Sequence, residues 1–536
     1  MCRWAGLARG YRGLVVDASR QARSSSADGA GHAGIAGAVA AAVALGVGEL
    51  VSAIADWQSP VISVDDRVID LAPGSAARRG IETFGHTDKP ALVIGTVVLC
   101  LVIGAVLGRA TVRRRWVGPV GFGIFGVVGA WAGIADPLVQ PSGAIVAALA
   151  ASLAGIATLL FLIRVDAPAT RTADATVTED PRSPTASRRA FFAWAGAGSA
   201  FALGAAGVAR SLRGPSAAEA ARAEVTLPPR SDLPRGLETD VPELTPLVTP
   251  NSDFYRIDTA LLTPQVDPKG WALRIKGMVD HPYQLTYPEL LDMATEEADV
   301  TLSCVSNEVG GKLVSTARWR GVPLAGLLDR AGVQPRAEQV VGRSVDDFTA
   351  GFPLEVVHDG RPALVAIAMN GEPLPLAHGF PARLVVAGLY GYVSATKWLA
   401  EIELTTWDAF DGYWIPRGWS KEGPIKTESR IDVPRDHAKL SRGRQPIAGV
   451  AWAGERGIEK VEVRVDHGPW RTARLGRELA KTTWRQWVLD WDAPPGRHTL
   501  AVRATDGTGK TQTDVVASPA PNGASGWHTI SVNVAD

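Results

Sequence analysis

Long apolar stretches occupy the first 210 residues of the chain. A helix needs ~20 apolar residues to cross a bilayer, and four stretches approach this length, whereas a fifth is rich in Ala and Gly and less hydrophobic. Glu49 is the one acidic residue inside a stretch; we expect it near the outer interface, rather than at a proton or ion site. The pattern predicts an α-helical transmembrane bundle, residues 1–210, with about five helices in the lipid bilayer. The stretches are residues 34–55, 91–107, 116–135, 143–163 and 191–208.

Arginines gather in two of the connections between these stretches, and the other connections hold few. Basic residues favour the cytoplasmic side of a membrane. All the clusters fall on that side if the N-terminus is cytoplasmic, which places everything after residue 208 outside the cytoplasm. We therefore expect a multi-pass protein of the cell membrane with an extracytoplasmic C-terminal part. The clustered residues are Arg109 and residues 113–115 in one connection, and Arg164, Arg171, Arg182, Arg188 and Arg189 in the other.

The fifth stretch begins with a pair of arginines. Residues 187–192 read Ser-Arg-Arg-Ala-Phe-Phe, which resembles a twin-arginine export signal, although it lies inside the chain. The alternative is that Arg188 and Arg189 only anchor the helix on the cytoplasmic side. Twin-arginine export carries folded proteins, often after a cofactor has been inserted, so the signal points to a cofactor.

Beyond the apolar stretches the chain reads as globular sequence. Residues 211–250 are rich in Pro, Ala and Glu, which predicts an extended linker. Strand-like and helix-like runs then alternate in residues 251–435, which predicts a mixed α/β domain. Short strands separated by turn signals follow in residues 440–536 and predict an antiparallel β-sandwich.

The charge and the number of cysteines exclude several classes of function. The 536 residues include 55 basic and 55 acidic side chains, so a broadly cationic nucleic-acid binder is excluded and no nucleic-acid partner is expected. Three cysteines are too few for a disulfide scaffold or a multi-cysteine metal site. Cys2 falls at the cytoplasmic N-terminus and Cys100 inside a span. Cys304 alone falls in the exported part.

Cys304 follows an alternating run that predicts a strand with Val300, Leu302 and Cys304 on one face. Polar and Gly-rich sequence comes next, and such a strand end can present a thiolate to a metal. From the spacing alone, a buried and inert cysteine is at least as good an interpretation.

A second group of residues has the chemistry of an anion site. His378 and Arg383 flank a Gly-Phe-Pro turn, and Lys397 follows a loop punctuated by glycines. Such side chains and exposed backbone N–H groups bind phosphate well. Each residue taken singly is more often structural.

These segments together resemble the sulfite oxidase family of molybdopterin enzymes. Residues 301–307 are similar to the family's molybdenum-ligand loop, and residues 378–383 match its His-Gly-Phe-Pro-x-Arg motif. Residues 396–398 match its Lys-Trp element, and residues 251–256 resemble its opening cofactor-contact segment. The combination is specific, although any one motif would not be.

The resemblance implies a molybdenum–molybdopterin cofactor (Mo-MPT) with Cys304 as the thiolate ligand of the metal. It also implies that residues 440–536 form an immunoglobulin-like domain, through which the chain could form a homodimer. The implied reaction is two-electron redox or oxygen-atom transfer on a small sulfite-like or sulfoxide-like substrate. The implied pterin-phosphate site comprises His378, Arg383 and Lys397, with backbone groups of Ser394, Ala395 and Thr396. The candidates near the pterin or substrate are Asn251, Tyr255 and Arg256, and those for catalysis are Cys304, Arg256 and Tyr413.

The sequence departs from the family near the substrate. Glu308 and Val309 stand where animal and plant sulfite oxidases carry arginines, and an acid there would repel sulfite. The family's active-site tyrosine falls near Asp411, with Tyr413 two residues on. No haem is expected within the chain, because no pair of histidines faces inward from the spans, so electrons must pass to a separate partner or carrier.

Two alternatives come from other classes. A cofactor-free, membrane-tethered binding or scaffold protein could retain the fold, although it would have no physical reason to keep Cys304, His378, Arg383 and Lys397 together. The helical bundle could instead be a transporter or a quinone-reactive module, but its spans lack the buried charges and broken helices typical of such sites.

Overall fold

A computed structural model describes residues 31–55, 57–73, 88–166, 184–212, 216–228 and 232–536. The chain divides into two compact units, Met1–Gly214 and Pro215–Asp536, and each is described by itself. Cys2, Arg171 and Arg182, which enter the sequence-based predictions, lie outside the described residues.

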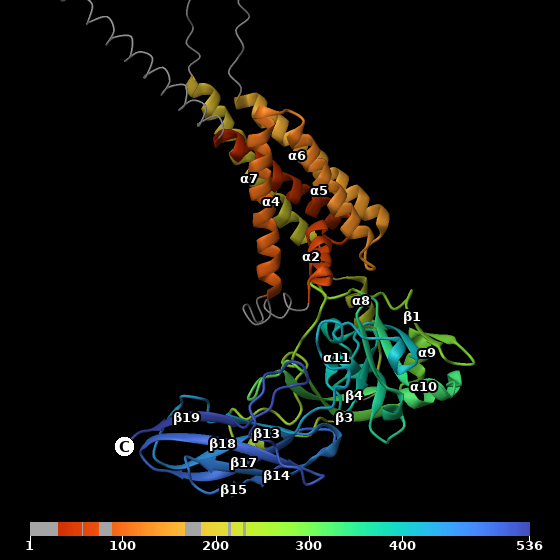
Figure 1. Cartoon of the computed structure of the whole chain (residues 1–536), viewed down its shortest axis with the longest axis vertical. Coiled ribbons are helices and arrows are strands. Elements are labelled where there is room, and N and C mark those ends of the chain that lie inside the picture. The colour runs from red at the N-terminus through yellow and green to blue at the C-terminus, as the bar shows by residue number, and fades with distance from the viewer. Residues whose placement is uncertain (1–30, 56, 74–87, 167–183, 213–215, 229–231) are drawn as a thin grey trace, which may run out of the picture. The chain divides into compact units, whose positions relative to one another are not determined.

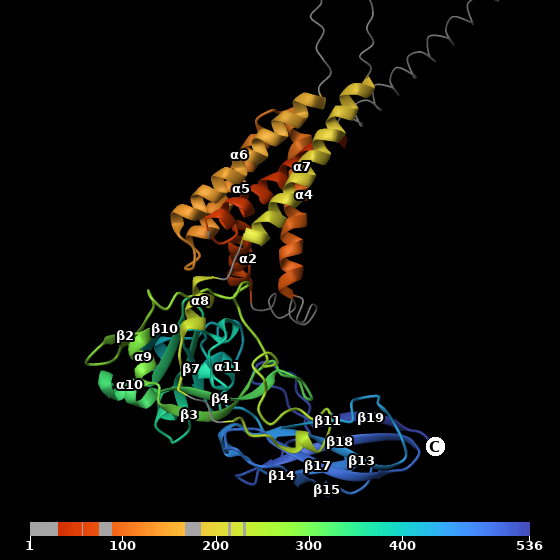
Figure 2. The ribbon, with the colours of Figure 1, turned by 180° about the vertical axis from the view of Figure 1, so that it is seen from behind.

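Helices make up the described part of the first unit. Five of them are long and apolar enough to cross a membrane, and this supports the predicted membrane association. They are Gly31–Ile54, α4 (Asp88–Arg113), α5 (Val117–Ile134), α6 (Pro141–Asp166) and α7 (Pro184–Leu212), and the shorter α2 spans Pro60–Leu71. The figures show α4 to α7 lying side by side (Figures 1 and 2).

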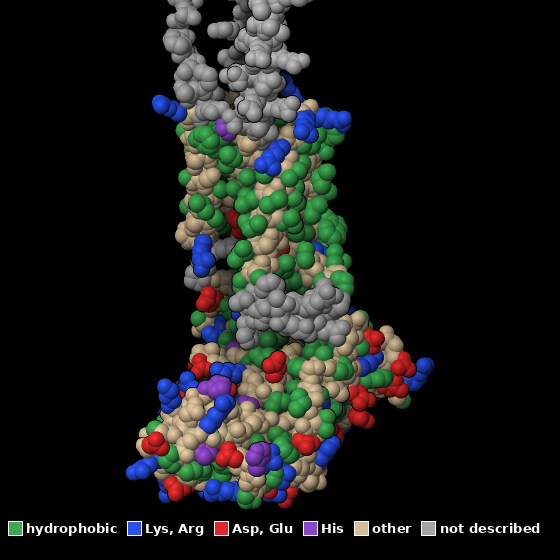
Figure 3. Space-filling model, turned by 60° about the vertical axis from the view of Figure 1, so that its left-hand side comes forward, with side chains coloured by type: hydrophobic (Ala, Val, Ile, Leu, Met, Phe, Trp, Pro, Cys, Tyr) green, Lys and Arg blue, Asp and Glu red, His purple; other side chains and the backbone are tan. Residues whose placement is uncertain are grey.

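Small residues allow the first helix to approach α4 closely. A Cβ added at Gly37 would lie 2.0 Å from the carbonyl oxygen of Gly104, so only glycine fits there. Large apolar side chains cover the outer faces of the helices instead, as Figure 3 shows. Such exposure suits contact with lipid. Examples are Val98, Val102, Val127, Leu149, Leu153, Phe192 and Leu203.

The two ends of the helical unit differ in chemistry. At one end, His32 lies 2.9 Å from Asp166 and stacks on Phe191, and a Cβ added at Gly34 would touch the Arg109 side chain. The start of the first helix, the end of α6, the start of α7 and the last turns of α4 therefore meet there. At the other end, Ser59 hydrogen-bonds to Glu49.

The second unit opens with two sheets packed around one core. One sheet has the strand order β2-β1-β10-β5-β6, and the other has the order β3-β4-β7-β8, with β9 paired to β7. All pairings are antiparallel except that of β1 with β10. The strands are β1 (Ala272–Gly277), β2 (Tyr283–Thr286), β3 (Glu296–Ser303), β4 (Val314–Pro323), β5 (Gln339–Ser344), β6 (Thr349–Pro353), β7 (Ala363–Met369), β8 (Glu372–Pro373), β9 (Arg383–Val386) and β10 (Leu399–Thr405).

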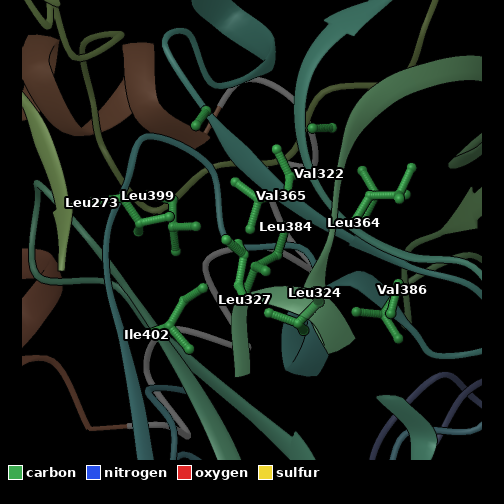
Figure 4. Packing of buried hydrophobic residues seen from close by; sticks show 14 of the residues in the cluster. Leu273, Val322, Leu324, Leu327, Leu364, Val365, Leu384, Val386, Leu399 and Ile402 are labelled. Atoms are coloured by element: carbon green, nitrogen blue, oxygen red, sulfur yellow. The ribbon is translucent and has the colours of Figure 1, made fainter. Parts of the chain in front are cut away.

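Short helices cover this core. Amphipathic α10 (Leu324–Ala331) buries Leu324, Leu327 and Leu328 and ends at Gly332, whose φ of +69° glycine tolerates. Figure 4 shows Leu324 and Leu327 packed with side chains from β7, β9 and β10, such as Leu364 and Leu384. The other helices are α9 (Tyr287–Met293), α11 (Gly391–Ser394), and the 3₁₀ turns η3 (Leu354–Val357), η4 (Leu376–His378) and η5 (Trp407–Ala409).

Two further sheets form the C-terminal region and share one apolar cluster that includes Ile447, Val461, Trp487, Leu500 and Val532. Their orders are β11-β13-β17-β16 and β12-β19-β18-β14-β15. The pairings are antiparallel, as predicted, except that β12 runs parallel to β19. The elements are β11 (Glu428–Val433), β12 (Lys439–Leu440), β13 (Gly443–Trp452), η6 (Gly454–Arg456), β14 (Ile458–Val465), β15 (Arg471–Thr472), β16 (Arg474–Leu475), β17 (Arg485–Ala493), β18 (Gly496–Asp506) and β19 (His528–Val534).

The segment expected to be an extended linker packs against both halves of the second unit. It holds the helix α8 (Ala217–Glu224) and the turn η2 (Leu237–Thr239). Arg222 donates to the carbonyl of Leu374 at 2.8 Å, and Gln486 accepts from the backbone N–H of Leu237 at 2.7 Å. Proline content predicts the scarcity of regular structure but carries no information about these long-range contacts.

Candidate active site

Cys304 lies immediately after β3, where the strand turns into a tightly held loop. Its side chain is buried, and its backbone N–H donates to Leu313 O at 2.9 Å. Asn307 fastens the loop, since its N–H donates to Cys304 O at 3.0 Å and its Oδ1 accepts from Leu313 N at 2.8 Å. Burial raises the pKa of the Cys304 thiol, and hydrogen bonds with Ser306 oppose that rise. The thiol is therefore shielded from solvent, and hydrogen bonds with Ser306 stabilise its thiolate form.

Residues of the C-terminal region contact this loop and the strand before it. Arg430 of β11 donates to Gly311 O at 2.8 Å. Gly310 has a φ of +78°, and a Cβ added there would lie 2.3 Å from the ring of His528. The N–H of Trp484 donates to Thr301 Oγ1 at 2.7 Å, which secures β3 itself. Residues far apart in the sequence thus fix the position of Cys304.

Tyr255 connects the cysteine to the anion-binding motif. Its ring stacks on Phe254 with centroids 5.4 Å apart. Burial raises the pKa of Tyr255, the nearby Cys304 raises it further and Arg383 lowers it, so its phenol lies within electrostatic range of both groups. A Cβ added at Gly391 would lie 3.7 Å from the Tyr255 hydroxyl and 3.9 Å from Ser303 O. The loop that begins α11 therefore lies against both Tyr255 and the end of β3.

Arg383 is a buried cation without an acidic partner among the described residues. Only 4% of the residue is exposed, and it forms no ion pair with any described residue. Its guanidinium donates to three backbone carbonyls, those of His378 at 3.2 Å, Ala395 at 3.4 Å and Leu384 at 3.4 Å, and lies 4.9 Å from the centre of the Trp319 ring. Burial lowers its pKa to about 10. This arrangement suits an anionic ligand, because an anion would offset the cost of the buried charge.

His378 lies beside Arg383 and is neutral near pH 7. Burial, together with the positive charge of Arg383, lowers its pKa to about 4. Its Nε2 lies 3.2 Å from Asn251 O, and since a carbonyl only accepts, Nε2 carries the proton. The sequence suggests a cationic cradle, but burial makes His378 a hydrogen-bonding member of it rather than a charged one.

Asp258, which the sequence analysis does not single out, binds two of the predicted cations. Its carboxylate is 1% exposed, lies 2.6 Å from Arg256 Nε and forms an ion pair with Lys397. Lys397 Nζ also donates to Ile257 O at 3.1 Å. Arg256 further donates to Thr263 Oγ1 at 2.7 Å. The signal available in the sequence was weak, because an acid two residues after an arginine is common on any surface.

The residues between Arg383 and Lys397 are mostly buried. Ser394 Oγ donates to Tyr390 O at 3.1 Å, and Thr396 Oγ1 donates to Gly342 O at 3.4 Å. Ala395 offers its carbonyl to Arg383. The two hydroxyls thus support the local backbone in this structure.

Two other predicted residues have mainly structural contacts. Asn251 Oδ1 accepts from Asn370 Nδ2 at 2.9 Å, which positions the carbonyl that His378 uses. Tyr413 packs between Phe348, with ring centroids 5.7 Å apart, and Arg417, 3.7 Å above its ring. The described residues hold no cluster of three or more His, Cys, Asp and Glu that could bind a metal.

Comparisons with known proteins identify the family of the chain. The family profile described as an oxidoreductase molybdopterin-binding domain matches residues 260–414, a range that includes Cys304, His378, Arg383 and Lys397. The chain is 30% identical over 341 residues to mitochondrial sulfite oxidase of Macaca fascicularis, covering 54% of this chain and 62% of that protein. It is 33% identical over 153 residues to the uncharacterized oxidoreductase YuiH of Bacillus subtilis, covering 28% of this chain and 74% of that protein.

Among solved structures, the chain aligns with the sulfane dehydrogenase SoxCD from Paracoccus pantotrophus at 25% identity and a TM-score of 0.47, covering 53% of this chain and 80% of that chain. The chain spans less than two thirds of the length of the sulfite oxidase it matches. The family profile and the curated relatives confirm the resemblance noted from the motifs: the chain belongs to the sulfite oxidase family of molybdopterin-dependent oxidoreductases.

Proposed function

We propose that this protein is a membrane-anchored, extracytoplasmic molybdopterin oxidoreductase that carries out two-electron redox or oxygen-atom transfer on a small sulfite-like or sulfoxide-like substrate. The observation that carries the proposal is Arg383, a buried and unneutralised cation that shares the neighbour Tyr255 with the buried thiol of Cys304. A scaffold protein would gain nothing from an uncompensated internal charge, which costs free energy unless an anion binds.

The proposed roles follow from these positions. Cys304 is the thiolate ligand of molybdenum, and Arg383 binds the pterin phosphate by charge while His378 supports it by hydrogen bonding. Lys397 acts together with Asp258, which holds its ammonium group in place. Backbone groups of Ser394, Ala395 and Thr396, in the loop before Lys397, also belong to the proposed phosphate site. The bound cofactor would supply the two-electron chemistry, and the chain would fix its geometry and exclude water.

The exposure of Glu308 keeps both sulfite-like and sulfoxide-like substrates in the proposal. Glu308 stands where the family's sulfite oxidases carry an arginine, but its side chain is exposed. Solvent and salt screen an exposed charge, so its repulsion of sulfite is weaker than in a buried pocket. Sulfite and a neutral sulfoxide both fit, and a substrate panel with artificial electron donors and acceptors separates them.

The proposed membrane topology has the N-terminus inside and the catalytic unit outside. The support for this topology comes from one end of the helical bundle. There the contacts of His32 and Arg109 bring together the start of the first helix, the end of α6 and the last turns of α4. At this end Arg113 closes α4, Arg114 and Arg115 follow it, all three exposed, and Arg164 lies in the last turn of α6. The arginine pair 188–189 begins the last span nearby, which fits both cytoplasmic anchoring and a twin-arginine signal.

A metal and pterin assay on detergent-purified full-length protein tests the function. We expect about one molybdenum per chain and a pterin released on denaturation. Cys304→Ser should lose redox activity and perturb metal binding, whereas Cys100→Ser, in α4, should retain both. A protein that is metal-free when purified from cells making the cofactor, yet fully functional, would contradict the proposal. Electrons would pass to a separate partner or carrier, and the C-terminal sheets would form the homodimer contact.

A further inference from the structure

Glu428, the first residue of β11, carries a buried carboxyl group. It is 5% exposed, and its Oε2 has no hydrogen-bond partner among the described residues. Two basic residues lie two positions away in the sequence: Lys426, whose ammonium group donates to Gly523 O and Asn522 Oδ1, and Arg430, which is ion-paired with Asp432 at 2.6 Å. A buried acid in such surroundings is costly when ionised, and strongly perturbed acids of this kind often belong to functional sites.

Two unsatisfied donors lie around this carboxyl group. Trp452 is directly opposite Glu428 in the β11–β13 register, so both side chains stand on one face of the sheet. Its indole N–H has no acceptor among the described residues. The Tyr390 hydroxyl accepts a hydrogen bond from Lys426 N at 3.4 Å, and its own proton has no acceptor in the described part of the chain. Buried donors and acceptors that miss each other in this way are usually bridged by water.

Tyr390 extends this group of polar atoms toward the cysteine. Burial raises the pKa of Tyr390, and both Glu428 and Cys304 raise it further, which places its hydroxyl within electrostatic range of the two. Tyr390 also packs in one apolar cluster with Trp452 and with Val305, the residue after Cys304. This shared packing joins the face of the sheet that carries Glu428 to the loop that follows Cys304.

We propose that Glu428 is the proton-holding group of the redox site, exchanging protons with it through Tyr390 and bridging water. This inference rests on the proposed function. In the oxidative direction, the substrate gains one oxygen atom from water, two electrons pass to the separate carrier, and two protons are released. Glu428 as carboxylate accepts one of these protons and later releases it to solvent. In the reductive direction, the same atoms and electrons move in reverse, and Glu428 as carboxylic acid donates.

The electrostatics suit this role near neutral pH. Burial raises the pKa of Glu428 to about 8, and the charge of Lys426 only partly offsets the effect of burial. A group with a pKa near the working pH exchanges protons most effectively. The charged and titratable groups near it are Lys426 from its own segment, Tyr390 from the loop before α11, and Arg430, which stands on the same face of β11 but is ion-paired with Asp432. The neighbouring Thr427 instead donates to Asp506, which Arg456 neutralises.

Infrared difference spectroscopy of the full-length protein tests the assignment without relying on turnover. The native protein should show the carbonyl band of a protonated carboxylic acid that disappears as the pH rises through about 8. Glu428→Gln should lose this band. Glu462→Gln is the matched control, since Glu462 is ion-paired with Arg503 at 3.0 Å and should leave the band unchanged.

Turnover of the loaded enzyme provides the second measurement. Glu428→Gln should keep native molybdenum and pterin content, lower kcat by roughly 100-fold and lose the kcat transition near pH 8. Tyr390→Phe should lower kcat but keep the infrared band. If Glu428→Gln does not fold, Glu428→Asp should shift both the band and the pH profile.

Three results would overturn the inference: no titrating band in the native protein, a band that survives Glu428→Gln, or a variant with native kcat and pH profile. The last result in a protein that carries molybdenum would leave the proposed function intact. A native protein without molybdenum would overturn both.

Discussion

Replacing Arg383 with methionine tests the anion site most directly. Methionine has similar length and fills the buried space without charge. The shift of the Arg383 pKa from 12.5 to about 10 corresponds to about 3 kcal/mol of cost for the charged form in the anion-free site. A bound phosphate would remove this cost. We therefore expect Arg383→Met to weaken cofactor binding by about 100-fold.

The effect on stability should differ between the two forms of the protein. In the cofactor-free form, loss of the three long hydrogen bonds of Arg383, at 3.2–3.4 Å, roughly offsets the relief of the buried charge. The melting temperature of that form should change little. In the loaded form, the variant should melt roughly 5 °C below the native protein, because it lacks about 3 kcal/mol of binding free energy.

The assay compares melting temperatures of protein made in cells with and without molybdopterin synthesis. Arg361→Met serves as the control, because Arg361 is also largely buried but pairs with Asp359 at 2.6 Å. This variant should lower both melting temperatures equally. If Arg383→Met destabilises both forms equally, or leaves the gain from the cofactor unchanged, Arg383 is a structural residue and the reasoning is refuted.

Three further predictions follow from the same physical arguments. Asp258→Asn removes the charge that binds Arg256 and Lys397, so it should destabilise the cofactor-free form by about 3 kcal/mol and the loaded form by less, which melting of the two forms measures. The pKa of Glu428 is raised from 4.5 to about 8, so its protonation stabilises the folded state fully below pH 4.5, and this contribution is lost as the pH rises through 8. Denaturant unfolding should therefore show a loss of up to about 5 kcal/mol in the free energy of unfolding over this range. Glu428→Gln should abolish that loss. Gly37→Val should disrupt the contact with Gly104 and lower the stability of the protein in detergent, whereas Gly95→Val, where an added Cβ meets nothing within 4 Å, should be tolerated; equal melting temperatures for the two variants would contradict the close helix contact.

The sequence could predict the residues that carry chemistry better than their states of charge. Cys304 and Arg383 lie at strand ends in recognisable motifs, and the fold brings both beside Tyr255. The neutral state of His378 depends on burial and on the nearby Arg383, which no local pattern reveals. The five apolar helices were predictable because a 20-residue apolar run is a local property.

Residues that act across long sequence separations were not predictable. Asp258 meets Lys397 139 positions later, and Glu428 meets Trp452 only through a strand register. Neither acid stands in a motif, and each gains its significance from the group that folding places beside it. The burial of the segment around Leu244 and Leu247 was not predictable either, because its prolines resemble those of a solvent-exposed linker.

The C-terminal region also helps to hold the loop that carries Cys304. Arg430 and His528 hold the loop that follows Cys304, and Trp484 secures the strand that precedes it. Glu428 reaches Tyr390 from the first strand of the same sheets. A thiolate ligand must keep its position to within a fraction of an ångström to fix the geometry of a metal. Since the residues that hold Cys304 come from both halves of the second unit, we expect substitutions at Arg430 or Trp484 to disturb the proposed metal ligand, although both residues lie far from Cys304 in the sequence.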